Sequence, residues 1–272
     1  MSFEGLRPLT DAAAGDWIAP RLDGFGSRVN QNLPDGFETY VRVFHPAGDE
    51  NGEPVTWAEV CHRLGRTAHA LMQWRSIARV GARQVDVDTP GGRQSASEYV
   101  SDWPGIEPRE GGAPAETFEI LLDVLARFTT TPDRAYHAVW DGFGWLHGGM
   151  WFGIGPVEDG QSHARSGQVP PEDVPPTAHL HHPGREFLLY EGPLTAALGI
   201  GETSFGRFCL QSPNILWPAD RAWCLATEID FDSTVVGGSA ELTRALLAAP
   251  GLEVWPVQPT DDLCYAGDHI NG

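Results

Sequence analysis

The chain has 272 residues, of which 37 are acidic and 18 are basic, so its formal net charge is −19. This charge opposes binding to nucleic acid, since the phosphate backbone is also negative. The arginines are too scattered to form a local basic patch that would offset it. All the basic residues are arginines, which excludes a P-loop lysine and a Schiff-base lysine. No segment approaches the ~20 consecutive apolar residues of a membrane helix, and the N-terminal residues lack a secretory-signal pattern. We therefore expect a soluble cytoplasmic protein with no nucleic-acid or membrane partner.

A strand and a long helix are predicted near the N-terminus. Residues Phe37 to His45 alternate between apolar and polar side chains, which predicts a strand. Thr56 and Glu59 have the spacing of a capping box, in which each side chain satisfies a free amide at the start of a helix. Apolar residues then recur at helical spacing, so we expect this helix to continue to about Arg79.

The next segments are predicted to be one irregular stretch, one helix and two strands. Residues 81–114 contain Pro-Gly and Gly-Gly breakers and are expected to be irregular. A helix is predicted from Ala115 to Phe128, because its phenylalanine and leucine residues share one face. Ala135–Trp140 and Gly149–Ile154 are predicted strands on either side of an Asp141-Gly142 turn.

The C-terminal part of the chain is predicted to be rich in strands. It follows residues 156–184, a Pro-, His- and Gly-rich loop that we expect to be flexible. Strands are predicted at Glu186–Tyr190 and Val254–Val257, and the clearest one at Arg221–Asp232. Ser239 can cap a final helix over Ala240–Ala248.

These elements predict an α+β fold with a mostly antiparallel sheet and helices packed against it. Residues 1–272 are expected to form a single domain, because no linker of distinct composition divides the chain. A division into a helix-rich part, 1–132, and a sheet-rich part, 133–272, stays possible.

The predicted strand Arg221–Asp232 carries the first candidate site. Side chains alternate along a strand, so Glu228, Asp230 and Asp232 would share one face. Carboxylates at this spacing repel one another unless they are solvated, protonated or bridged by a cation. The strand therefore indicates either a catalytic site, with a hard metal or an acid/base pair, or a sheet face that emerges into water.

The same residues resemble the first motif of the haloacid-dehalogenase-like phosphohydrolases, in which a hydrophobic strand ends in D-x-D-x-T. The resemblance would make Asp230 the nucleophile and Asp232 the general acid/base. It covers about ten residues, and the lysine-free chain cannot supply the phosphate-binding lysine of that family.

A second candidate site is the histidine group at residues 179–182. In a strand His179 and His181 would lie on one side, a spacing that metal sites use, and Glu186 could complete the set. The alternative is a solvated loop between prolines. No cofactor is expected from any other motif, so a divalent metal bound by His179, His181, Asp230 or Asp232 is the one possibility.

Aromatic residues near the predicted sheet edges are candidates for a binding surface. Trp145, Trp217 and Trp223, with Arg221, could line a ligand groove or a protein-binding face. Packing in the core of the sheet is the alternative explanation for these tryptophans.

Several segments resemble an uncharacterised family of actinobacterial proteins with no assigned function. A fainter likeness is to the SUKH-type immunity superfamily, whose acidic α+β domains bind and neutralise toxins; Leu33-Pro34-Asp35-Gly36-Phe37 is similar to its early Leu-Pro pattern. The segments that resemble the actinobacterial family are Leu33-Pro34 to His45-Pro46, Trp217-Pro218-Ala219-Asp220-Arg221-Ala222-Trp223, residues 227–234 and Gly237-Gly238-Ser239.

The leading hypothesis is a non-catalytic acidic binding protein with a protein partner, because no catalytic template is complete. The first alternative is a metal-dependent hydrolase that uses Glu228, Asp230 and Asp232. The second is a small-ligand binder with a tryptophan-lined cleft.

Overall fold

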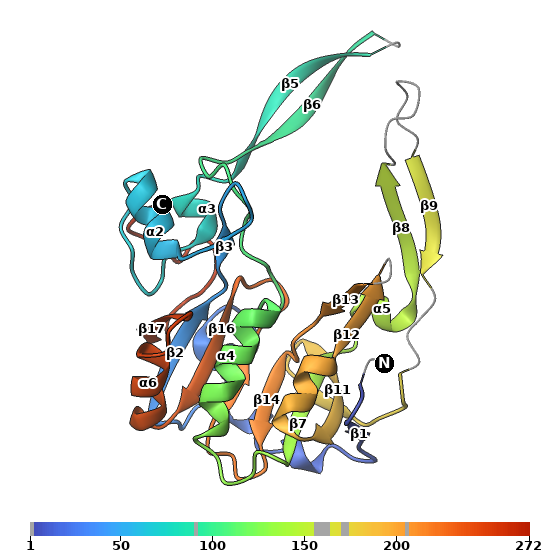
Figure 1. The fold of residues 1–272 in the computed structure, drawn as a ribbon, viewed down its shortest axis with the longest axis vertical. Coiled ribbons are helices and arrows are strands. Elements are labelled where there is room, and N and C mark those ends of the chain that lie inside the picture. The colour runs from blue at the N-terminus through green and yellow to red at the C-terminus, as the bar shows by residue number, and fades with distance from the viewer. Residues whose placement is uncertain (1–2, 90–91, 155–163, 170–173, 205–206) are drawn as a thin grey trace.

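The computed structural model describes residues 3–89, 92–154, 164–169, 174–204 and 207–272. Its centre is a nine-stranded antiparallel sheet, drawn in Figure 1, which confirms the predicted α+β class. The nine strands are β1 (Arg7–Pro8), β2 (Thr39–Phe44), β7 (Ala135–Trp140), β10 (His179–His182), β11 (Arg185–Gly192), β14 (Ile215–Pro218), β15 (Cys224–Ala226), β16 (Ser233–Gly238) and β17 (Glu253–Val257). Eight of them follow the order β1-β11-β7-β14-β15-β16-β2-β17, and β10 pairs with β11.

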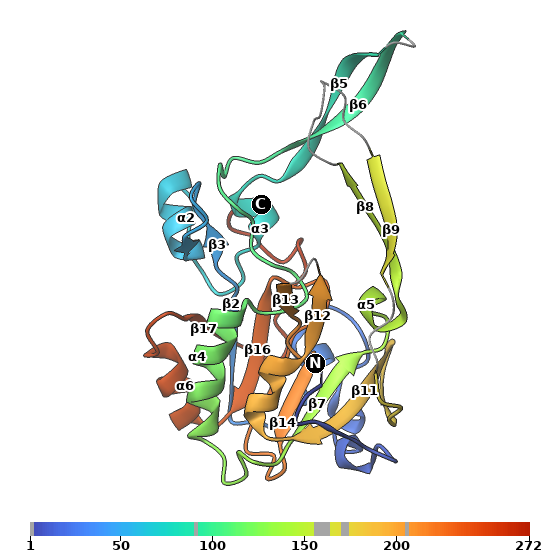
Figure 2. The same ribbon diagram turned by 45° about the vertical axis from the view of Figure 1, so that its right-hand side comes forward.

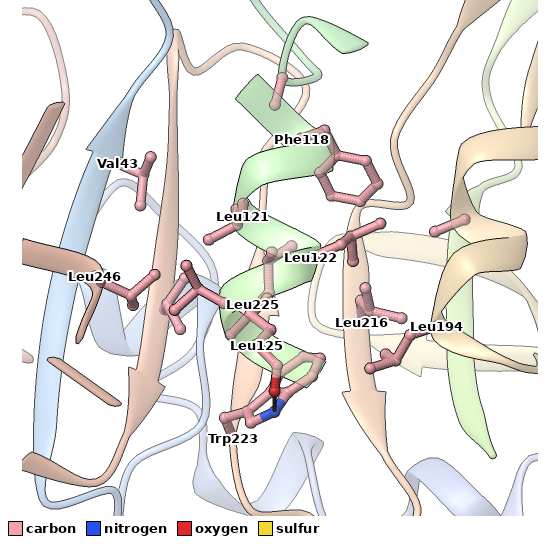
Figure 3. Close-up of a cluster of buried hydrophobic side chains, with 14 of the residues drawn as sticks. Val43, Phe118, Leu121, Leu122, Leu125, Leu194, Leu216, Trp223, Leu225 and Leu246 are labelled. Carbon is pink, nitrogen blue, oxygen red and sulfur yellow. Dashed lines mark hydrogen bonds between the residues drawn. The ribbon is translucent and has the colours of Figure 1, made fainter. Parts of the chain in front are cut away.

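Two helices cover one face of the sheet, α4 (Ala115–Ala126) and α6 (Ala240–Leu247). Both agree with the predicted helices, and Ser239 caps α6 by accepting the Leu242 N–H. The apolar side of α4 packs on side chains that the sheet presents at alternate positions, as Figure 3 shows for Leu121, Leu216 and Leu225. The Trp223 indole donates to the Leu125 carbonyl in this layer.

The N-terminal segment covers the opposite face of the sheet. It carries two 3₁₀ helices, η1 (Ala13–Gly15) and η2 (Ala19–Arg21), and the short helix α1 (Val29–Asn32). Trp17, Ile18 and Leu33 pack there with Ile215 and Trp217. Strands from both halves of the chain thus share one sheet between two apolar layers. The smaller elements are β3 (Ala47–Gly48), β4 (Pro54–Val55), α5 (Gly144–His147), η3 (Leu194–Gly199), β12 (Gly201–Ser204) and β13 (Arg207–Leu210).

The first long helix is shorter than predicted. Thr56 caps α2 (Trp57–Leu64) by accepting the Glu59 N–H, as expected. Gly65 then takes the left-handed conformation, with φ 66°, and its N–H closes the last turn. The prediction that the helix continues to Arg79 was therefore wrong. The residues Trp74–Ile77, within the predicted range, form a separate short helix, α3.

Two long hairpins project from the same end of the molecule, as Figures 1 and 2 show. We call them the arms. One is β5 (Gly81–Thr89) with β6 (Gly92–Val100), and the other is β8 (Gly149–Ile154) with β9 (Ala164–Val169).

The arms correct several predictions. Residues 81–114 are not irregular throughout, because β5 and β6 pair with each other along their whole length. The predicted strand Gly149–Ile154 is confirmed, but it pairs with β9 and not with β7. The described part of residues 156–184 contains β9 and β10; the rest of that loop lies outside the described residues.

The predicted strand Arg221–Asp232 was also wrong, because β15 covers just Cys224–Ala226. The neighbouring strand β14 begins at Ile215, which pairs with Ala226. The residues after Ala226 therefore lie beyond the end of β14 and have no strand to pair with on that side. The chain turns there instead, and the Phe231 N–H donates to the Glu228 carbonyl.

Within the described part of the chain, no helix has the length and apolar character that a membrane crossing requires.

Candidate binding cleft

One end of the sheet collects most of the polar side chains predicted to be functional. Strands β7 and β15 end there, at Trp140 and Ala226, and β11 and β16 begin there, at Arg185 and Ser233. Both arms leave the body from this end (Figure 2). We call it the arm end of the sheet.

The arm end contains a cleft of about 280 Å³. Its lining comes from four separate parts of the chain: the start of α3, the loop before α4, the turn before β16 and the C-terminal segment. The lining includes Trp74, Arg75, Glu110, Asp230, Asp232 and Tyr265. We call this space the acidic cleft, because three of these side chains are carboxylates.

A backbone hydrogen bond holds the loop before α4 against the turn before β16. The Gly111 N–H donates to the Phe231 carbonyl over 2.9 Å. Gly111 has φ 73°, and a Cβ atom there would lie 2.7 Å from the Ile229 carbonyl oxygen. Glycine therefore permits the close approach that brings Glu110 opposite Asp230 and Asp232.

Asp232 is the most enclosed of the three carboxylates, with 15% of its side chain exposed, compared with 79% for Asp230. Its Oδ1 lies 3.3 Å from the guanidinium of Arg42, which is 1% exposed. Arg42 also donates to the Met72 carbonyl and the Ser233 hydroxyl. Burial raises the pKa of Asp232 to about 6, an effect that Arg42 opposes and Glu110 reinforces.

Glu110 has a raised pKa as well. Partial burial is the largest cause, followed by the negative charges of Asp230 and Glu107, while Arg75 acts in the opposite direction. Arg75 is exposed, and its guanidinium lies 5.7 Å from the centre of the Tyr265 ring. The cleft therefore holds more negative than positive charge, and a cation entering it would relieve the repulsion.

Glu228, the third acidic residue predicted from the sequence, has a different partner. Arg185 donates to its Oε1 through Nε and Nη2, over 3.0 and 2.7 Å. The same guanidinium lies 5.2 Å from the Phe25 ring centre and 5.3 Å from that of Trp140. Glu228 is thus engaged by Arg185 at the border of the cleft.

The histidine group forms strand β10 and not the expected loop, and His179 and His181 are exposed on it. His179 lies 3.2 Å from Asp141, whereas His181 lies 2.7 Å from Glu186. Within the described ranges, no group of three or more His, Cys, Asp or Glu residues is arranged to hold a metal ion. The structure therefore does not bring His179, His181, Asp230 and Asp232 together around one centre.

The aromatic candidates are located away from the acidic cleft. Trp217 and Trp223 are fully buried in the two core layers, so they offer no surface to a partner. Trp145 is partly buried against Phe143, and the exposed Arg221 lies over the Trp17 ring. Core packing, the alternative explanation, accounts for both Trp217 and Trp223.

Sequence reasoning selected Asp230 and Asp232 but missed Trp74, Glu110 and Tyr265. Trp74 was counted as part of the long helix, and Glu110 falls among glycines. No local pattern indicates that these residues meet, because they are joined by tertiary packing alone. The D-x-D-x-T resemblance also loses its context, since Asp230 and Asp232 precede strand β16 instead of ending a strand.

Comparisons with known proteins give no identification: no family model, no curated protein and no solved structure matches the chain. The resemblance to SUKH-type immunity proteins therefore stays a prediction.

Proposed function

We propose that the chain is a non-catalytic binding protein that receives a basic segment of a protein partner in the acidic cleft. The observation that carries this proposal is the convergence of Glu110, Asp230 and Asp232 on a cleft with aromatic walls. Carboxylates attract cationic groups, and ring faces bind them further through their quadrupole. The overall charge of −19 favours approach of a basic partner from a distance.

The position of the cleft supports a macromolecular partner over a small ligand. The cleft is open enough to leave Asp230 and Tyr265 largely exposed, at 79% and 68%. Small-ligand sites usually enclose most of the ligand surface. The two arms also flank this end of the sheet, where they extend the surface available to a partner (Figure 2).

A blocked peptide of alternating glycine and arginine, with its lysine counterpart, tests the proposal by calorimetry. Both peptides are expected to bind the wild-type protein. Replacing Glu110→Gln together with Asp230→Asn should weaken binding of each by about tenfold, because two attractive charges are lost. Both residues are exposed, so the variant should keep the wild-type circular dichroism spectrum.

A charge-matched control separates a local effect from that of the net charge. Glu119 and Asp123 are exposed on α4, away from the cleft lining. Replacing Glu119→Gln together with Asp123→Asn should change the affinities by less than about twofold. Equal weakening by the two double variants, or no binding of either peptide, would contradict the proposal.

A further inference from the structure

We propose that the acidic cleft is selective for arginine: it takes a guanidinium of the partner between its carboxylates and the Tyr265 ring, in competition with the protein's own Arg75. This inference rests on the proposed function and specifies the group that is recognised. The arm end of the sheet already holds two guanidinium groups of the protein's own, those of Arg42 and Arg185, in the same kind of contact.

Arg42 is the first example of that arrangement. Its guanidinium pairs with Asp232 and lies 4.2 Å from the centre of the Phe44 ring and 5.7 Å from that of Trp57. A planar, delocalised cation can stack on a ring and donate to a carboxylate at the same time, which a compact ammonium group does less well.

Arg185 repeats the arrangement on the other side of the turn before β16. Its guanidinium bonds to Glu228, lies 3.5 Å from Asp230, and stands over the rings of Phe25 and Trp140. Two guanidinium groups at this end of the sheet are therefore each held by carboxylates and aromatic faces together.

The acidic cleft between them offers the same chemistry. Glu110, Asp230 and Asp232 supply carboxylates, and Tyr265 supplies an exposed ring. The exposed Arg75 lies over that ring, 5.7 Å from its centre, and makes no ion pair within 4.0 Å to any described residue. A cation therefore already lies at the edge of the cleft. Asp232 and Asp230 contact Arg42 and Arg185 from outside it, over 3.3 and 3.5 Å, whereas Glu110 has no ion-pair partner within 4.0 Å among the described residues.

This arrangement makes Arg75 a resident competitor. A guanidinium brought by the partner would bond to the carboxylates directly, and its stacking on Tyr265 would displace Arg75. Since an exposed side chain on a short helix moves at little cost, its displacement should reduce the affinity by a modest factor instead of preventing binding.

The test compares the arginine and lysine peptides on wild-type protein, Tyr265→Ala and Arg75→Ala, using calorimetry. Wild-type protein should bind the arginine peptide about fivefold more tightly than the lysine peptide. Tyr265→Ala should remove most of this preference, and Phe208→Ala, at an exposed ring on β13, should leave it intact. Arg75→Ala should bind the arginine peptide about two- to fivefold more tightly than wild type does, with Arg244→Ala on α6 as the charge-matched control.

Equal affinity for the two peptides, both weakened by Glu110→Gln with Asp230→Asn, would overturn the arginine selectivity and leave the proposed function standing. A preference for arginine that survives Tyr265→Ala would overturn the role of the ring. Weaker binding by Arg75→Ala would overturn the competition. If the affinities of both peptides are the same for the cleft variants as for the wild-type protein, the proposed function itself is contradicted.

Discussion

Asp232 combines a structural contact with an unfavourable charge. It forms an ion pair with the buried Arg42, yet burial and the nearby Glu110 raise its pKa to about 6. A carboxyl whose folded pKa exceeds its unfolded value binds a proton more readily in the native state. Its ionisation therefore lowers the stability of the protein as the pH rises from about 4 to about 6.

The variant Asp232→Asn tests this balance. Asparagine stays neutral at every pH, and its carbonyl can still accept from Arg42, so the variant should be more stable than wild type by about 1–3 kcal/mol at pH 7. The difference should vanish near pH 4, where Asp232 is protonated. Urea unfolding at the two pH values measures it, with the exposed Asp230→Asn as the control. A variant that is less stable than wild type at pH 7 would show that the ion pair outweighs the cost of burial.

At the scale of single residues, part of the cleft lining could be predicted from the sequence. Asp230 and Asp232 stand out because acidic residues alternate with apolar ones, although the strand inferred from that alternation does not form. Trp74, Glu110 and Tyr265 lie far away along the chain and acquire their role through contacts that local patterns do not encode. Likewise, Trp217 and Trp223 were ambiguous, because a buried and a ligand-binding tryptophan are the same in sequence.

Secondary-structure elements could be predicted where one of their faces is buried. Helices α4 and α6 and strands β7, β11 and β17 each place apolar residues on the core side, which produces a periodic pattern. Among the described residues, the arm β5–β6 pairs with no further strand. It was not predicted, although Val85 and Val87 alternate with polar residues, because the Pro-Gly and Gly-Gly breakers of residues 81–114 indicated an irregular stretch. Helix α2 was extended too far because the left-handed Gly65, which ends it, lies within an apolar repeat.

The arm β5–β6 should be dispensable for folding. No described residue of Gly81–Thr89 or Gly92–Val100 belongs to the core clusters. Replacing residues 83–98 with an Asn-Gly turn keeps the Ala82↔Tyr99 pair and the Tyr99 hydroxyl donor to Glu107. The midpoint of thermal unfolding should then stay within about 3 °C of the wild-type value.

The variant Leu121→Ala is the comparison for the excision of the arm, because it removes a core side chain. Leu121 is fully buried between α4 and the sheet (Figure 3), and its truncation should cost about 2–5 kcal/mol and lower the midpoint clearly. If excision of the arm lowers the midpoint as much as Leu121→Ala does, the arm contributes to the stability of the body.

The acidic cleft lies at the arm end of the sheet. Both arms project from that end (Figures 1 and 2). Strands from both halves of the chain build that end, so the turn that carries Asp230 and Asp232 is anchored to a continuous sheet through β15 and β16. The net charge of −19 adds a long-range attraction for basic partners, which salt should weaken. This attraction follows from composition alone, but composition does not give the place where the partner binds.

The most direct measurement is the titration of the Asp232 carboxyl, followed by NMR of the protein labelled with ¹³C at aspartate, with and without the arginine peptide. The free protein should show a midpoint of about 6 for Asp232. A guanidinium held in the cleft stabilises the ionised carboxyl, so saturating peptide should lower this midpoint by at least about one pH unit. An unchanged midpoint, while other resonances show that the peptide is bound, would mean that basic segments bind elsewhere and that the acidic cleft is not the site.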